Sequence, residues 1–161
     1  MRFILIDKIT AVEAGRSIHA VKGVTLAEEY LGDHFPTFPV LPGVLLLQGL
    51  VESASWLVRI TEDFAHSMIL LDQAKNVRYK SFLAPGGQIE YAITAKEIRK
   101  DASSFTGEGV AGGQQIVEAR FTLRHFNLAD RDARLAGVDA EVIDALRARL
   151  GLLRQGKEQG T

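Results

Sequence analysis

Cysteine is absent from this sequence of 161 residues, which excludes disulfide bonds, thiolate metal sites and a cysteine nucleophile. A chain without cysteine fits a reducing compartment. Long apolar runs are missing too, since the run at residues 44–47 is far short of the roughly 20 residues that span a bilayer. The start, MRFILIDK, lacks the longer apolar core of a signal peptide. We therefore expect a cytoplasmic protein with no membrane partner.

Charge of one sign is not in excess. The 19 Lys and Arg side chains nearly balance the 20 Asp and Glu side chains, and the formal net charge is −1. Nothing in that balance favours nucleic acid or an anionic membrane as a partner. The length suits one domain with a substantial core.

Metal-ligand patterns are also missing among the 4 histidines. No two of them have the i, i+4 spacing, and there is no HExxH motif, so the sequence predicts no metal site. His19 and His125 lie within predicted strands and His66 follows a predicted helix end. We interpret these three as ordinary surface or core side chains.

Proline is scarce, and its placement singles out the segment around His34. Of the 4 prolines, those at positions 36, 39 and 42 restrict the loop that follows His34. Pro42 suits the first position of a helix predicted to run to about residue 60. The free N–H groups and positive dipole of that helix start, with Gly43 permitting close approach, can bind a carbonyl oxygen or oxyanion. His34 is therefore a candidate acid–base group, and the alternative is a loop histidine that merely caps a neighbouring group.

The helix predicted after Pro42 is apolar almost all round, so we expect it to be buried. Its polar exceptions, Gln48, Glu52, Ser55 and Arg59, follow a spacing of 4, 3 and 4 residues and share one stripe. A buried polar stripe needs partners, which predicts that it faces a cavity or a subunit interface. For Glu52 two interpretations stay open: a functional carboxyl, or a group paired with Arg59 or with a second subunit.

Strand signals dominate the rest of the chain up to residue 126. Residues 3–9, 17–25, 67–82, 88–98, 103–110 and 114–126 are rich in β-branched, aromatic or alternating residues, and Gly112-Gly113 predicts a hairpin. Antiparallel strands with one apolar helix predict an α+β fold whose sheet wraps around that helix. We expect one domain over residues 1–127 and an extension over residues 128–161. The extension contains a surface helix capped by Asp139, then a frayed tail over residues 154–161.

The block His34-Phe35-Pro36, followed by PVLPGVL at residues 39–45, resembles the active-site signature of the β-hydroxyacyl–acyl carrier protein dehydratases. The likeness extends over most of residues 3–126, including VRYKSFLAP at residues 77–85. The resemblance implies a hotdog fold and a homodimer or dimer-based oligomer with active sites between subunits. It implies a substrate carried on the phosphopantetheine of acyl carrier protein or coenzyme A, and no cofactor of the enzyme's own.

The resemblance also implies roles for individual residues. His34 would remove a proton from C2 of a (3R)-hydroxyacyl thioester, and the N–H of Gly43 would polarise the thioester carbonyl. The family's acid falls 14 residues after the histidine, where this chain has Gln48, and a carboxyl appears one turn later as Glu52. An amide cannot donate and recover a proton as a carboxyl can, so Glu52 with Gln48 would replace the usual acid.

The implied function is a hydro-lyase that forms a trans-2-enoyl thioester in fatty-acid, lipid or polyketide synthesis. Two alternatives remain: a non-catalytic module that binds acyl chains or the carrier protein, and an acyl-thioester hydrolase. Arg78 and Lys80 are candidates for contacting the phosphate or an acidic carrier protein, or are plain strand charges. Phe82, with Trp56 and Leu83, is a candidate lining of an acyl tunnel or simply core.

Overall fold

The computed structural model describes residues 3–155. The two helices are α1 (Gly43–Thr61) and α2 (Ala136–Arg154). The strands are β1 (Lys8–Glu13), β2 (Ser17–Gly23), β3 (Met68–Tyr79), β4 (Gln88–Ile98), β5 (Ala102–Ala111) and β6 (Gln114–Phe126). Single 3-10 turns lie at Glu29–Gly32, Leu128–Asp130 and Ala133–Leu135.

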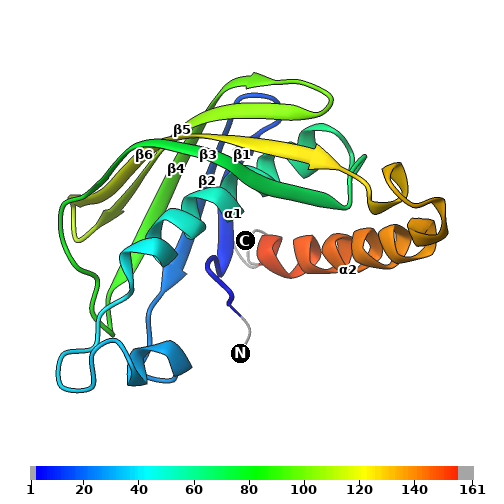
Figure 1. Cartoon of the computed structure of the whole chain (residues 1–161). Coiled ribbons are helices and arrows are strands. Elements are labelled where there is room, and N and C mark those ends of the chain that lie inside the picture. The colour runs from blue at the N-terminus through cyan, green and yellow to red at the C-terminus, as the bar shows by residue number, and fades with distance from the viewer. Residues whose placement is uncertain (1–2, 156–161) are drawn as a thin grey trace, which may run out of the picture.

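All the strands join one antiparallel sheet of 6 strands in the order β1-β2-β4-β5-β6-β3. The sheet curves around α1, which lies against its inner face (Figure 1). Trp56 and Leu50 of α1 are fully buried there against Tyr91 and Phe105 of the sheet. This arrangement confirms the predicted α+β hotdog fold. By length and composition α1 is apolar enough to cross a bilayer, but a core helix passes the same test, and 56% of its most apolar window is buried.

The predicted ends of the strands agree with the structure where the strand-like sequence pattern is long. β4 and β6 match the predictions residue for residue, and Gly112 and Gly113 form the hairpin between β5 and β6 with φ of 57° and 76°. Pro42 differs slightly from expectation, since it is the residue before the helix and Gly43 is the first helical residue.

The predicted first strand over residues 3–9 is wrong in its position. Pairing begins only at Lys8, whereas Leu5 and Ile6 are buried without belonging to a strand. The backbone N–H of Leu5 donates to Oε2 of Glu52 on α1 at 3.2 Å, in place of a neighbouring strand's carbonyl. A contact to the helix therefore sets the course of this segment.

The predicted cap at Asp139 is also wrong, because α2 begins three residues earlier at Ala136. The buried carboxylate of Asp139 instead accepts hydrogen bonds from the N–H groups of Leu128 and Ala129, each at 2.9 Å, and from the hydroxyl of Ser67. It ties α2 to the turn before it and to the start of β3. The apolar stripe of α2 packs against the core through Leu146, Leu150 and Leu153. Of the predicted tail, residues 156–161 lie outside the described residues.

Candidate active site

His34 lies at the start of a tight loop between the Glu29–Gly32 turn and α1. Phe35 and Phe38 exchange backbone hydrogen bonds of 3.2 and 3.1 Å, and the N–H of Val40 donates to the carbonyl of His34 at 3.0 Å. The His34–Phe35 peptide bond is cis, and the two rings stack with centroids 4.3 Å apart. The loop thus folds back on itself and presents a half-buried imidazole.

The tautomer of His34 follows from the hydrogen bond that its ring makes to the backbone of Val40. Nδ1 lies 3.1 Å from the carbonyl oxygen of Val40. A carbonyl can only accept, so in the neutral ring the proton is on Nδ1 and the lone pair is on Nε2. The loop therefore holds Nε2 ready to accept a proton.

The start of α1 lies directly after this loop. Gly43 is the first helical residue, so its N–H has no partner within the helix. A Cβ atom at Gly43 would lie 3.3 Å from the ring of Tyr79, which explains why a glycine suits this position. Leu41 is fixed by donating its N–H to the carbonyl of Leu83 at 2.8 Å. The loop and the helix start are therefore anchored to the segment after β3.

The polar stripe of α1 faces a cavity, as predicted. Gln48, Glu52, Ser55 and Arg59 all line a cavity of about 270 Å³. The opposite walls come from Phe3, from residues 69–71 of β3, and from Leu146 and Arg149 of α2. Gln48 is exposed at one end of the stripe, whereas Glu52 and Arg59 are more enclosed.

Glu52 occupies an environment that favours its protonated form. Burial raises the pKa of this carboxyl above its ordinary value of 4.5. That rise in pKa is opposed only in part, by the Leu5 N–H, the charge of Arg149, the Trp56 side chain and Arg59. Burial in turn lowers the pKa of Arg59 to about 10, against the pull of Glu52. A raised pKa makes a carboxyl better able to hold and donate a proton.

The structure brings the predicted residues together as two groups within one chain. His34 and Gly43 share the loop and helix start, and Gln48 and Glu52 share the cavity under α2. His34 is not among the residues that line that cavity. Within residues 3–155, no hydrogen bond or ion pair joins His34 to Glu52.

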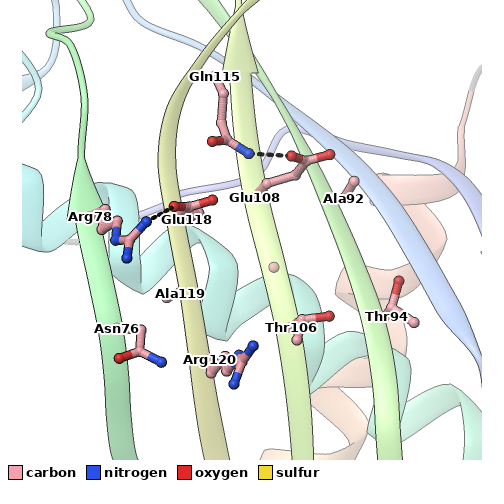
Figure 2. Close-up of a pocket in the computed structure, with 11 residues that line it drawn as sticks. Asn76, Arg78, Ala92, Thr94, Thr106, Glu108, Gln115, Glu118, Ala119 and Arg120 are labelled. Carbon is pink, nitrogen blue, oxygen red and sulfur yellow. Dashed lines mark hydrogen bonds and ion pairs between the residues drawn. The ribbon is translucent and has the colours of Figure 1, made fainter.

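The predicted substrate-binding cations are engaged with the sheet. Arg78 and Lys80 lie 3.4 and 3.3 Å from the carboxylate of Glu118 on β6. Arg78 borders a polar groove of about 450 Å³ on the sheet face away from α1, shown in Figure 2. Of the candidate tunnel residues, Trp56 and Leu83 belong to the core. Phe82 is 71% exposed, and its ring meets the ring of Phe38 edge-on with centroids 6.4 Å apart.

A FabA-like domain model matches residues 1–120. The chain belongs to the FabA-like family. Among curated members, it is 33% identical over 122 residues to the 3-hydroxyacyl-[acyl-carrier-protein] dehydratase FabZ of Bacillus subtilis, covering 74% of this chain and 85% of that protein. The FabZ dehydratase of Shewanella loihica is 31% identical over 120 residues, covering 73% and 78%.

Solved structures agree with the FabA-like fold. The chain is similar to the dehydratase heterocomplex ApeI:P from Xenorhabdus doucetiae, with a TM-score of 0.66 and 17% identity over 83% of this chain and 90% of that one. It is also similar to AziG of S. sahachiroi, with a TM-score of 0.58 and 10% identity over 75% and 91%. At these identities the likeness supports the fold alone.

Sequence reasoning missed two contributors to the environment of Glu52 in this FabA-like chain. Arg149 comes from α2, and the Leu5 N–H comes from a segment predicted to be a strand. Neither has a local sequence signal, because each reaches Glu52 only through tertiary packing.

Proposed function

We propose that this protein is a 3-hydroxyacyl-thioester dehydratase that removes water to give a trans-2-enoyl thioester in fatty-acid or related lipid or polyketide synthesis. Membership of the FabA-like family and the FabZ dehydratases among its relatives support the reaction class. The observation that carries the proposal is the hydrogen bond from His34 Nδ1 to the Val40 carbonyl, because it leaves Nε2 free as the base.

The proposed reaction begins at the loop and the helix start. Nε2 of His34 takes the proton from C2 of the substrate, while the N–H of Gly43 stabilises the negative charge that develops on the thioester oxygen. The electron pair from the C2–H bond forms the C2–C3 double bond as the C3–O bond breaks. The hydroxyl leaves as water after it receives one proton, so atoms and charge balance.

We assign that second proton to Glu52, with Gln48 orienting the leaving hydroxyl. The raised pKa of Glu52 supports this role, since a donor must hold its proton at working pH. Gln48 is exposed one turn nearer the start of α1, where an amide can hydrogen-bond the hydroxyl or a bridging water.

We further propose a homodimer in which His34 and Gly43 of one protomer work with Gln48 and Glu52 of the other. The separation of the two residue groups within one chain supports a shared site. So does the exposed apolar surface of the edge strand β3, of loops and of the start of α1: Leu70, Leu71 and Tyr79 are 38–49% exposed, and Phe35, Phe38, Val44 and Phe82 are 52–71% exposed. Exposed large apolar side chains of this kind are typical of a protein interface.

The proposed substrate is delivered by acyl carrier protein or coenzyme A, and the chemistry uses only proton transfers, with no cofactor of the enzyme's own. Arg78 and Lys80 are exposed enough to meet an acidic carrier, although both already contact Glu118. We place the protein in the cytoplasm, in keeping with a chain that has no cysteine.

The decisive assay incubates a 3-hydroxyacyl–acyl carrier protein with wild type, His34→Ala, Glu52→Gln and Gln48→Glu, and follows enoyl formation and thiol release separately. Loss of a general base or acid lowers the rate by about 10²–10⁴-fold, which is the effect expected for His34→Ala and Glu52→Gln. A gain on Gln48→Glu would show that a carboxyl at the family's usual position suffices. Matched controls are His19→Ala and Glu90→Gln, both exposed on the sheet.

The outcomes separate the candidate functions. Thiol release without enoyl product would indicate an acyl-thioester hydrolase, and no turnover in any variant would indicate a binding module. Full activity of Glu52→Gln would refute its role as the acid.

Mixing the two inactive variants tests the shared site. If His34 and Glu52 meet across the dimer, half of the dimers are mixed and one site in each is intact, so about a quarter of the wild-type activity returns. If both residues act from one chain, mixing restores nothing. A purely monomeric protein in solution would also contradict the proposal.

Charge reversal tests the carrier surface. Arg78→Glu with Lys80→Glu should raise KM for the carrier-bound substrate and leave KM for a short synthetic thioester unchanged. Equal effects on both substrates would instead indicate a change in the fold of β3.

A further inference from the structure

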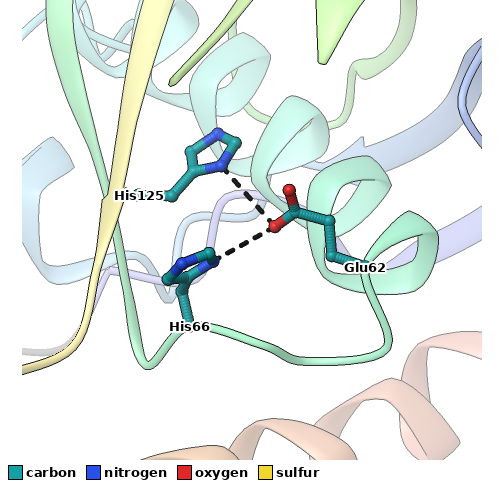
Figure 3. A group of neighbouring side chains, drawn as sticks. All are labelled: Glu62, His66 and His125. Atoms are coloured by element: carbon teal, nitrogen blue, oxygen red, sulfur yellow. Dashed lines mark hydrogen bonds and ion pairs between the residues drawn. The ribbon is translucent and has the colours of Figure 1, made fainter. Parts of the chain in front are cut away.

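Three side chains at the end of α1 furthest from Gly43 converge on one point. Glu62 directly follows α1, His66 lies in the loop before β3, and His125 lies near the end of β6. Figure 3 shows both imidazole rings directed at the carboxylate of Glu62. One ligand atom from each residue lies within 4.8 Å of the others.

The spacing of these atoms fits a tetrahedral metal ion. Oε2 of Glu62 is 3.2 Å from Nδ1 of His66 and 3.6 Å from Nδ1 of His125. Bonds of about 2.1 Å from Zn²⁺ to nitrogen and oxygen place tetrahedral ligands about 3.4 Å apart, and the two observed distances lie on either side of that value. The remaining nitrogen–nitrogen edge is no longer than 4.8 Å.

His125 supplies a second, independent observation. Its side chain is fully buried, and within the described residues Nδ1 has no hydrogen-bond partner. Nε2 lies 2.7 Å from the hydroxyl of Ser103. When Nε2–H donates to Ser103, the lone pair of Nδ1 faces the Glu62 oxygen. The Nδ1 lone pair of His125 and the Glu62 carboxylate oxygen then repel each other, and a cation bound between them would remove that repulsion.

The surroundings leave room for an ion and a water ligand. The cluster borders a cavity of about 700 Å³ that is also lined by Lys100, Asp101 and Asp130. This cavity provides an entry path and space for a fourth ligand, as tetrahedral sites with three protein ligands require. Two imidazoles and a carboxylate suit Zn²⁺ and similar divalent transition metals better than Mg²⁺ or Ca²⁺.

We propose that Glu62, His66 and His125 form a binding site for Zn²⁺ or a similar divalent transition metal. The ion joins the end of α1 to the loop before β3 and to β6. Glu52 lies ten residues before Glu62 and so about 15 Å away by helical rise, and Gly43 is about 27 Å away at the other end of α1, so the site is separate from the proposed reactive groups on α1. Its role is to stabilise the fold, and it takes no part in dehydration.

The test uses the full chain without an affinity tag, stripped of metal and titrated with Zn²⁺ by calorimetry, with Co²⁺ absorption as a readout of tetrahedral coordination. Wild type should bind one Zn²⁺ per chain. At 100 times Kd the bound ion should raise Tm by about 5–10 °C.

Glu62→Gln and His66→Gln each remove one ligand from a partly exposed position and avoid the fully buried His125. Each should weaken Zn²⁺ binding by about 100-fold and abolish the Co²⁺ bands, while dehydratase activity without added metal stays unchanged. His19→Gln removes an exposed histidine of β2 and should bind Zn²⁺ as wild type does. Wild type that binds no Zn²⁺, or binding that is the same in all three variants, would overturn the site.

Discussion

Gly49 of α1 packs directly against the ring of Tyr91 on β4, and replacing it is the sharpest test of the packing. A Cβ atom at Gly49 would lie 2.1 Å from Oη, 2.3 Å from Cζ and 2.9 Å from Cε2 of Tyr91 on β4. Tyr91 is only 1% exposed, so its ring has no free space to enter. We predict that Gly49→Ala destabilises the protein even though alanine is the better helix former.

The magnitude follows from two opposing effects. Alanine in a helix interior gains about 1 kcal/mol over glycine. Overpacking a dense core typically costs about 1–3 kcal/mol, and contacts this short place Gly49→Ala at the upper end of that range. The expected net loss is about 2 kcal/mol in the free energy of unfolding. For a domain of this size that corresponds to a Tm about 4–8 °C lower.

Urea denaturation measures the change, and α2 provides a matched control. Gly151 is also helical, but a Cβ atom there would meet nothing within 4 Å among residues 3–155, so Gly151→Ala should gain about 0.5–1 kcal/mol. The double variant Gly49→Ala, Tyr91→Leu removes the clashing ring atoms and should be more stable than the sum of the single changes predicts. A Gly49→Ala variant as stable as wild type, or two changes whose effects add within about 0.5 kcal/mol, would contradict a clash between residue 49 and Tyr91.

Three further predictions concern buried charges. Burial opposes ionisation of Asp139, but hydrogen bonds from Ser67 and two N–H groups outweigh it and lower its pKa. The ionised Asp139 therefore stabilises the folded protein above its ordinary pKa of 3.8, and this stabilisation is lost as pH falls through the lower pKa of the folded state. In urea denaturation at a series of pH values, Asp139→Asn should not show this loss of stability in acid. For Glu52 the pH dependence of stability has the opposite sign, because burial raises the pKa of this carboxyl. The free energy of unfolding should fall as pH rises from 4.5 through the pKa of the folded state, and Glu52→Gln should remove that fall in the same measurement. Lys22, with its side chain 6% exposed, lies 3.5 Å from Asp7 and 2.7 Å from Glu28. Lys22→Met should lower the free energy of unfolding by about 1–3 kcal/mol, and an unchanged urea midpoint would contradict this.

Much of the fold could be predicted because its strongest signals are local. The alternation in β4 and β6, the glycine pair between β5 and β6, and the apolar helix after Pro42 all follow from nearby residues. The errors arise where distant contacts decide. Residues 3–6 have a strand-like composition, but the N–H of Leu5 bonds to Glu52, which lies 47 residues away along the chain. Asp139 has the residue type of a cap, yet it bonds to the turn before α2.

In the candidate sites, too, the residues with local sequence signals could be predicted, and those brought together by distant contacts could not. His34 and Gly43 could be proposed from adjacent prolines and a helix start, while the tautomer of His34 needed the position of the Val40 carbonyl. Glu62 and His66 are one helical turn apart in the sequence, which is a usable ligand signal. His125 joins them only because β6 lies beside the end of α1, and no spacing rule contains that information.

The position of the Glu52 carboxyl on α1 links helix α2 to the proposed chemistry. At position 48 the side chain is exposed, whereas one turn later Glu52 is enclosed by the Leu5 segment and by Arg149 of α2. Enclosure raises the pKa of Glu52, and the Leu5 N–H and then the charge of Arg149 lower it again in part. In the proposed mechanism, the balance of these effects sets how much of Glu52 holds a proton at a given pH. The acidity of a carboxyl at position 52 therefore depends on the Leu5 segment and, to a smaller extent, on α2.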